Sequence, residues 1–311
     1  MGKFKGITGN KTGRIGNEIY YMNKSVNLIR SAPTHVYDPK SIKQTIQRIK
    51  MVNTQNGYKY IQQFNDLDLF PDKKELENQQ NAFVRFNISN ALLVPKDLCK
   101  KKYVPMFTLD LMMSNGIFVR ANMNFDKDFD TKLGLVIDSV NPQGGVATVA
   151  DATNKILKYY PVLENGDKIV FYMYGTEDIE SSEDDDVIAT YSDGASLRTY
   201  SQRSIFTLDT HNNNLLFNEG FFCSHDRVLC PMIKNVIYDW IGNVENEHVA
   251  WMTATFINKP NTEQQRIGTS GYGYTTGYFD ICEKLTSDED TQLKIIEEWG
   301  ANMNYNTGLD N

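Results

Sequence analysis

Histidine and cysteine are the residues of this sequence best suited to chemistry, and neither type falls in a catalytic or metal-binding pattern. No histidine stands in a nucleophile elbow or a His-Glu-x-x-His motif; the histidines are His35, His211, His225 and His248. No cysteine pair has the short spacing of a zinc knuckle, so reduced, buried thiols are expected; the cysteines are Cys99, Cys223, Cys230 and Cys282. Lys11-Thr12 ends like a phosphate-binding loop, but Asn10 stands where that loop needs glycine. We therefore expect no enzyme, no metal and no cofactor.

The distribution of charge is a stronger signal, because it is uneven along the chain. Residues 1–50 carry ten Lys or Arg against Glu18 and Asp38, a net charge of +8. The remaining 261 residues carry −15, which gives the overall net charge of −7. A basic segment joined to an acidic body indicates an anionic partner. Three interpretations stay open: a solvated tail, contact with DNA, and contact with the acidic body of a neighbouring copy. The spacing of the cations matches no DNA-recognition helix.

The basic residues begin in an arm, residues 1–40, that has too little regular pattern to fold alone. Residues 19–22 and 26–29 flank a turn at Asn23-Lys24-Ser25 and predict a short hairpin. A two-stranded hairpin is marginal in water, so the arm needs a surface to lie on. Three arginines are expected to anchor it by charge, and two tyrosines and an isoleucine to make strand contacts. These candidate assembly residues are Arg14, Arg30 and Arg48 and then Tyr20, Tyr21 and Ile29.

Helical spacing of apolar residues follows the arm, in the segment 41–95. It predicts one helix over 40–64, with Ser41 as N-cap, and a second over 78–93. A last amphipathic helix is expected over 286–300, within a C-terminal segment 286–311 that ends in a tail. Its N-terminus is acidic, and Leu293, Ile296 and Trp299 or Ile295 are expected to face inward.

Short strands separated by Gly, Pro and Asn turns fill the middle of the chain. The expected strands are 106–112, 116–124, 132–140, 168–174, 205–208, 220–224, 248–257, 266–272 and 278–282. Their spacing predicts a mainly β fold with some α, built of immunoglobulin-like β-sandwich modules. The first module is 96–190, and 191–285 is a second module or a continuation of the first. Alternation in 171–174 predicts a strand with one face in a core, and 180–186 reads as a solvated acidic loop. No apolar run approaches the length of a membrane span.

Several different short motifs are distributed over most of residues 1–280. They are Gly6-Ile7-Thr8-Gly9, Gly13-Arg14-Ile15-Gly16-Asn17, Val26-Asn27-Leu28-Ile29-Arg30-Ser31-Ala32-Pro33, Gln44, Gln47-Arg48, Asn81-Ala82-Phe83, Ser114-Asn115-Gly116, Asp239-Trp240-Ile241-Gly242, His248-Val249-Ala250-Trp251 and Thr269-Ser270-Gly271-Tyr272. Together they resemble an uncharacterised protein family from Bacteroidetes and their phages. The acidic loop and the helix after 285 have no counterpart in that pattern.

The resemblance implies a virion structural protein, because the family is similar to ring-forming neck or tail proteins of crAss-like phages. It implies a homomeric ring, twelvefold, below the portal, in a particle made in the bacterial cytoplasm. The partners would be further copies of the chain and adjacent neck, tail or portal proteins, with DNA only passing through and no membrane. An arm reaching onto the next copy suits such a ring, and an acidic body suits a channel through which DNA slides without sticking.

A receptor- or carbohydrate-binding adhesin is the alternative function. It would use exposed tyrosines at Tyr272, Tyr274 and Tyr278 as a stacking platform. Tyrosines packed into the protein would count against it.

Overall fold

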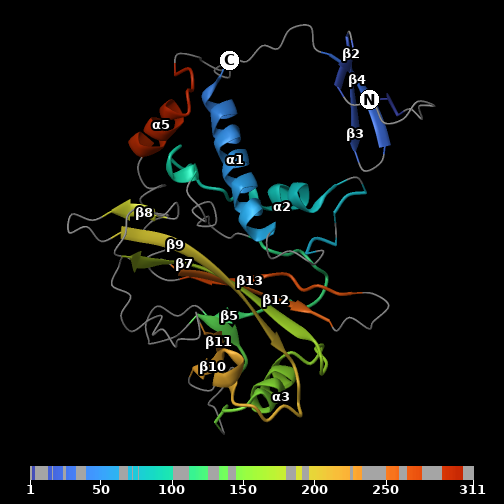
Figure 1. Cartoon of the computed structure of the whole chain (residues 1–311), viewed down its shortest axis with the longest axis vertical. Helices are drawn as coiled ribbons and strands as arrows, with labels where there is room; N and C mark the ends of the chain where they lie inside the picture. Colours follow the sequence, from blue (N-terminus) through green and yellow to red (C-terminus); the bar gives the residue numbers. More distant parts are fainter. Residues whose placement is uncertain are drawn as a thin grey trace.

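The computed structural model has three antiparallel sheets with helices beside two of them (Figure 1). The described residues are 2–3, 13–15, 17–23, 26–32, 40–62, 69–71, 73–75, 77–100, 112–124, 133–138, 145–179, 187–190, 196–224, 227–232, 250–258, 265–274 and 289–303. The expectation of antiparallel strands together with helices is confirmed, as a mixed α/β architecture.

The largest sheet has five strands in the order β13-β12-β7-β9-β8. The strands are β7 (Lys168–Ile179), β8 (Val187–Thr190), β9 (Ser196–Thr207), β12 (Ala250–Ile257) and β13 (Gly271–Tyr274). The central strand β7 pairs antiparallel with β9 on one side and with β12 on the other. Strands from both sides of residue 190, the expected module boundary, therefore share one sheet.

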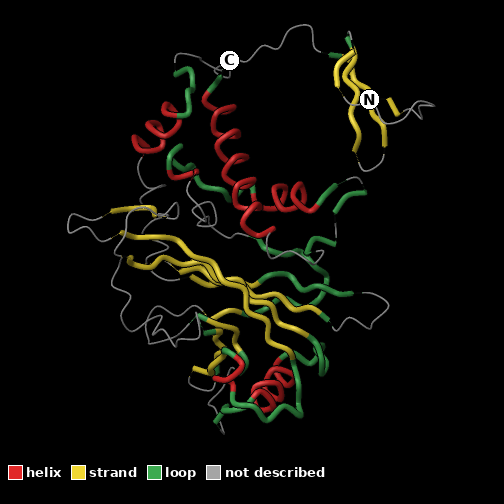
Figure 2. The backbone as a smooth tube through the Cα atoms, viewed as in Figure 1, coloured by secondary structure: helices red, strands yellow, loops and turns green. Residues whose placement is uncertain are grey.

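Both faces of this five-stranded sheet are buried. Phe171 and Met173 of β7 pack into one core cluster, whereas Tyr172 and Tyr174 pack into a second cluster on the opposite face. All four side chains have no exposed surface. The prediction that one face of 171–174 packs in a core is confirmed, and the second face, which helices cover, is buried as well (Figure 2).

Two helices form that covering layer, α1 (Ile42–Gln62) and α2 (Gln79–Asn87). Tyr58 of α1 and Phe83 of α2 pack in the second cluster with ring centroids 5.6 Å apart. The expected N-cap of α1 is confirmed. Ser41 Oγ accepts a hydrogen bond from the Gln44 N–H at 3.3 Å, and Gln44 Oε1 accepts one from the Ser41 N–H at 3.3 Å.

Helix α2 ends at Asn87, although the sequence predicts a helix to residue 93. The Asn87 Nδ2 donates to the carbonyls of Phe83 and Met112, both at 2.9 Å, and its Oδ1 accepts from the Met112 N–H. These bonds tie the end of the helix to a segment distant in sequence. The chain then continues as the buried residues 91–94.

The expected C-terminal helix is α5 (Glu289–Glu298). Its Ile295 and Ile296 pack with Ile49 of α1 in a third cluster. The two isoleucines face inward as expected, whereas Leu293, which was expected to do so as well, is 38% exposed.

The opposite face of the five-stranded sheet is covered by a four-stranded sheet and a helix. These elements are β5 (Met123–Asn124), β6 (Gly134–Val136), β10 (Phe221–Ser224), β11 (Val228–Pro231) and α3 (Val149–Tyr159). Sequence analysis missed α3. Thr148 Oγ1 accepts from the Asp151 N–H at 3.2 Å, and the Asp151 carboxylate accepts from the Thr148 N–H at 3.1 Å. This reciprocal cap was visible in the sequence as a Thr-x-x-Asp start signal.

Residues 112–122 run as an extended segment beside the edge of the five-stranded sheet. The Phe118 N–H donates to the Ile267 carbonyl at 3.0 Å. The approach is close enough to require glycine at 116, since a Cβ added there would lie 1.6 Å from the Ile267 oxygen. The expected strand 116–124 is thus a regular strand only at β5.

Other predicted segments are either longer than expected or lie partly or wholly outside the described residues. The strands expected over 168–174 and 205–208 are confirmed but longer, because β7 continues to Ile179 and β9 begins at Ser196. The expected strand 278–282, the acidic loop 180–186 and residues 304–311 lie outside the described residues, as does nearly all of 106–112.

Candidate assembly interface

The N-terminal arm forms a sheet of its own, and the predicted hairpin is confirmed as its two longest strands. The strands are β1 (Gly2–Lys3), β2 (Gly13–Ile15), β3 (Glu18–Asn23) and β4 (Val26–Ser31), in the order β1-β4-β3-β2. We call this the N-terminal sheet. β2 begins at Gly13, whose φ of 124° is a conformation that favours glycine. The two short strands widen the hairpin to four strands, which sequence analysis did not anticipate.

Five of the six candidate assembly residues lie in this sheet, but they divide between its two faces. Tyr20 pairs directly with Ile29, and cross-strand partners in an antiparallel ladder share a face. Gly13 and Gly2 continue the same row on either side. The Tyr20–Ile29 pair is therefore flanked by residues without side chains.

The other face collects the basic positions. Arg14 pairs with Ile19, and Ile19 pairs with Arg30, so the two arginines flank an isoleucine in one cross-strand row. In the next row Leu28 pairs with both Lys3 and Tyr21. We call this set of positions the cationic face; it consists of Lys3, Arg14, Ile19, Tyr21, Leu28 and Arg30.

Few side chains of the N-terminal sheet are buried. Among its described side chains up to residue 32, only Leu28 and Ala32 are buried, and Arg30 is exposed. Tyr20 and Tyr21 are half-buried. The Tyr20 hydroxyl donates a hydrogen bond to the Glu18 carboxylate, and this bond is the main reason that the pKa of Tyr20 lies above its usual value. The apolar surface of the sheet is thus only partly covered.

The sixth candidate, Arg48, is not brought to the N-terminal sheet. It lies on α1, on the exposed side of that helix, next to the fully buried Ile49. Figure 1 shows the N-terminal sheet standing apart from α1 and α2, at the same end of the molecule. Arg48 therefore belongs to the body of the protein, although sequence analysis had grouped it with Arg14 and Arg30 of the arm.

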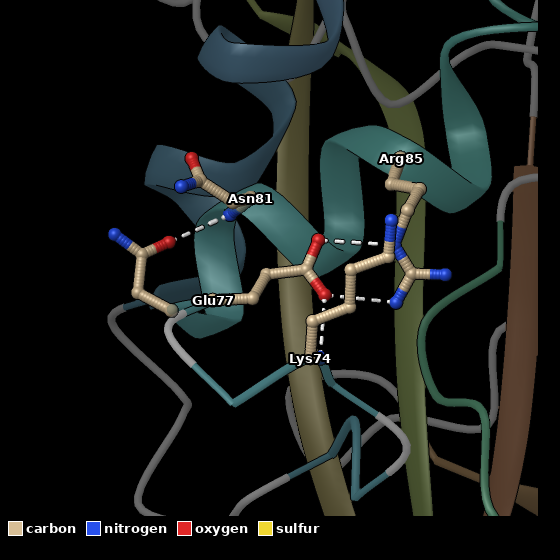
Figure 3. A network of polar contacts seen from close by, with 5 residues as sticks. Lys74, Glu77, Asn81 and Arg85 are labelled. Carbon is tan, nitrogen blue, oxygen red and sulfur yellow. Dashed lines mark hydrogen bonds and ion pairs between the residues drawn. The ribbon is translucent and has the colours of Figure 1, made fainter. Parts of the chain in front are cut away.

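A charged cluster on the body fixes the start of α2 (Figure 3). The Glu77 carboxylate accepts hydrogen bonds from Arg85 Nε at 3.0 Å and Nη2 at 2.9 Å, and from the Lys74 N–H at 3.0 Å. These contacts, the Arg85 bonds above all, lower the pKa of Glu77 to about 2. Asn78 caps the helix by accepting from the Asn81 N–H at 2.7 Å. All of these contacts lie within residues 74–85, so the cluster stabilises the turn before α2 and the start of that helix.

The histidines and cysteines that were considered for chemistry are only partly described. His211 is an exposed loop residue whose N–H donates to Asp209 Oδ1 at 2.9 Å. Cys99 and Cys230 are buried, and burial raises the pKa of the Cys99 thiol. The described residues contain no group of three or more His, Cys, Asp or Glu placed to hold a metal ion. Cys223, which was expected to be buried, is half-buried. His35, His225, His248 and Cys282 lie outside the described residues.

Of the three tyrosines of the adhesin alternative, Tyr272 is the one whose side chain the structure describes; Tyr274 ends β13 and its side chain lies outside the description. Tyr272 of β13 is half-buried against the second core cluster, with the Arg120 guanidinium 5.4 Å from its ring centroid. Tyr278 lies outside the described residues.

None of the helices that the structure describes is long and apolar enough to cross a membrane. The chain matches no protein-family model, no curated protein and no solved structure.

Proposed function

We propose that this chain is a structural subunit of a bacteriophage virion, without catalytic activity, whose copies assemble into a ring in the neck or tail below the portal. The observation that carries the proposal is the N-terminal sheet. It stands apart from the body, buries little of its own surface and gathers basic positions on one face (Figure 1). Such a sheet needs a second surface to cover it.

A neighbouring copy is the surface that fits best on charge. The first 50 residues carry +8 and the remaining 261 carry −15, so copies attract one another when the arm of one meets the body of the next. A contact between two different surfaces of the same chain is heterologous, and it closes into a ring when the rotation permits. The twelvefold copy number belongs to the sequence resemblance and stands as part of the proposal.

The body of each subunit supplies the wall of the ring in this proposal. The five-stranded and four-stranded sheets pack face to face around one core cluster, which supports an immunoglobulin-like sandwich as its architecture. An acidic wall repels the phosphates of DNA, so DNA passes through the channel without being held. Portal and adjacent neck or tail proteins would contact the two rims.

Light scattering of the purified full-length chain tests the proposal. We expect the molar mass of a closed assembly of many copies, and rings in negative-stain images. The variant Arg14→Glu with Arg30→Glu is expected to shift the mass toward that of a single chain, whereas Lys158→Glu, an exposed change on α3, leaves the assembly intact. A wild-type chain that stays at a single-chain mass over the whole accessible concentration range would overturn the proposal.

A further inference from the structure

The connection between β9 and β10 presents an aromatic ring and a leucine to the solvent. It contains the short helix η3 (Leu216–Glu219). Leu216 is buried in the core between the five-stranded and four-stranded sheets, whereas Phe217 is 54% exposed and Leu215 is 53% exposed. The buried leucine thus holds its two neighbours outward. The ring of Phe217 packs on no aromatic ring of the described residues, so it is available to a ligand.

Hydrogen bonds fix the conformation of this turn in the free protein. The Leu216 N–H donates to the Ala147 carbonyl at 3.0 Å, and the Val149 N–H donates to the Asn214 carbonyl at 3.0 Å. The Asn214 Nδ2 also donates to Glu219 Oε1 at 2.8 Å, which closes the turn from one side to the other. A surface that is already held in place loses little conformational entropy when a ligand covers it.

Side-chain amides occupy positions on both sides of Phe217 in this turn. Asn213, Asn214 and Asn218 are exposed. The amides of Asn213 and Asn218 have no hydrogen-bond partner among the residues that the structure describes. Each amide offers two N–H donors and one acceptor oxygen, and the Glu219 carboxylate is a further acceptor. A ligand rich in hydroxyl groups can use both kinds of group, because a hydroxyl donates and accepts.

The charges near the turn favour a neutral ligand. In the described segments 145–154 and 212–224, which meet at the turn, the charged residues are Asp151 and Glu219, with no lysine or arginine. The next cation on α3, Lys155, pairs with Asp138 at 3.6 Å. A phosphate, sulfate or carboxylate group on the ligand would therefore meet like charge on these segments and no compensating cation.

We propose that this turn binds a neutral hexopyranose sugar. The C–H face of the pyranose ring stacks on Phe217, because the negative face of an aromatic ring attracts the partial positive charge of C–H groups. The sugar hydroxyls exchange hydrogen bonds with Asn213 and Asn218. Figure 1 shows α3 and β10, which lie next to the turn, at the end of the molecule away from the N-terminal sheet.

The inference is independent of the proposed function, because one chain holds the whole site. A ring of copies would present the site many times. It would then hold a polysaccharide more tightly than one chain does, without any new contact.

Saturation-transfer NMR on the full-length chain tests the proposal, with the methyl glycosides of glucose, galactose and mannose as probes at millimolar concentration. We expect a signal from at least one glycoside, strongest for the C–H protons on one face of its ring. Phe217→Ala is expected to weaken binding at least about fivefold, and Asn218→Ala about threefold. Phe217→Tyr keeps an aromatic ring and should bind like the wild type. Phe217→Leu keeps an apolar side chain without the ring and should bind as weakly as Phe217→Ala.

Ile117→Ala is the matched control, because it removes an apolar side chain that is 81% exposed in the extended segment 112–122. This variant should bind the glycosides like the wild type. Methyl glucuronide carries a carboxylate and is expected to bind more weakly than methyl glucoside. Thermal unfolding followed by circular dichroism should give all Phe217 variants the wild-type Tm, because the side chain is exposed.

The outcomes distinguish a sugar site from a protein contact. No signal from any of the three glycosides, or an undiminished signal in Phe217→Ala, would overturn the proposal. Wild-type binding by Phe217→Leu would refute the stacking. If the wild type binds no glycoside and Phe217→Ala lowers the mass of the assembly, the turn is a protein contact instead. A chain that binds a glycoside through Phe217 but stays at a single-chain mass would support the sugar site while the proposed ring fails.

Discussion

Replacing Gly116 with alanine is expected to destabilise the body strongly, because the extended segment and the sheet edge touch at that residue. An added Cβ would lie 1.6 Å from the Ile267 carbonyl oxygen, which belongs to the backbone and cannot rotate away. Carbon and oxygen seldom approach within about 3 Å, so the two backbones must separate by about 1.4 Å. The Phe118 N–H to Ile267 carbonyl hydrogen bond of 3.0 Å lies beside this point and is expected to break.

The magnitude follows from these two effects. Overpacking in a closely packed region costs about 1–3 kcal/mol, and the lost hydrogen bond adds about 1 kcal/mol. The expected decrease in the free energy of unfolding is therefore about 2–4 kcal/mol. In a chain of 311 residues that corresponds to a decrease in Tm of roughly 3–6 °C.

Gly145→Ala is the matched control, because the same methyl group is added where no atom lies within 4 Å and the residue is exposed. Thermal unfolding followed by circular dichroism should leave this variant within about 1 kcal/mol of the wild type, on the stable side if the backbone accepts alanine without strain. A Gly116→Ala variant whose Tm equals that of Gly145→Ala would refute the close approach of the two segments.

Three further changes test the contacts that shape the body. Thr148→Ala removes the cap of α3 and should lower stability by about 1 kcal/mol in urea unfolding, whereas Thr148→Ser should not. Tyr160→Phe removes a hydroxyl that donates to the Val136 carbonyl at 2.9 Å and accepts from a backbone N–H, so a loss of about 1–2 kcal/mol is expected; an unchanged urea midpoint would contradict it. Glu77→Gln should cost about 0.5–1 kcal/mol at pH 6. Because the folded-state pKa of Glu77 is lowered to about 2 from a usual 4.5, this difference should shrink as pH falls from 4.5 toward 2, and a gap that stays constant over that range would contradict the Arg85 pairing.

Local signals in the sequence predicted the parts of the fold that local physics decides. Apolar spacing and Ser41 located α1, and the turn at 23–25 located the hairpin β3–β4. The start signal of α3, Thr148 followed by Asp151, had the same local character and was available to the same reasoning.

Tertiary contacts decided what the sequence did not reveal. Helix α2 stops at Asn87 because that side chain binds Met112, a partner 25 residues away that no local pattern specifies. The second face of β7 is buried because helices from elsewhere in the chain cover Tyr172, which periodicity on one strand does not indicate. Burial and the end of α2 therefore depended on partners, whereas the starts of α1 and α3 did not.

The candidate interface also shows the difference between what local sequence predicts and what pairing between distant residues decides. The candidate residues on the arm were chosen by type, as arginines, tyrosines and an isoleucine, but their faces depend on the register between strands. The β3–β4 register sends Tyr20 and Ile29 to one face and Arg30 to the other, and the pairing of the three-residue strand β2 with β3 places Arg14 in the row of Arg30. A shift of one residue in β2 would move Arg14 to the other face.

The separation of the arm from the body has a consequence for how assembly would gain its specificity. A sheet that buries only Leu28 and Ala32 among its described side chains gains little stability from its own packing, so a docking partner must supply much of what keeps it ordered. Exposed ion pairs add little net free energy, but they penalise any register that brings like charges together. In the proposed ring, apolar positions of the arm such as Ile19 would then supply affinity, while the charges beside them select the acidic body of another copy over other surfaces. The same charges keep two cationic faces from pairing with each other, which favours head-to-tail growth over a closed two-fold dimer.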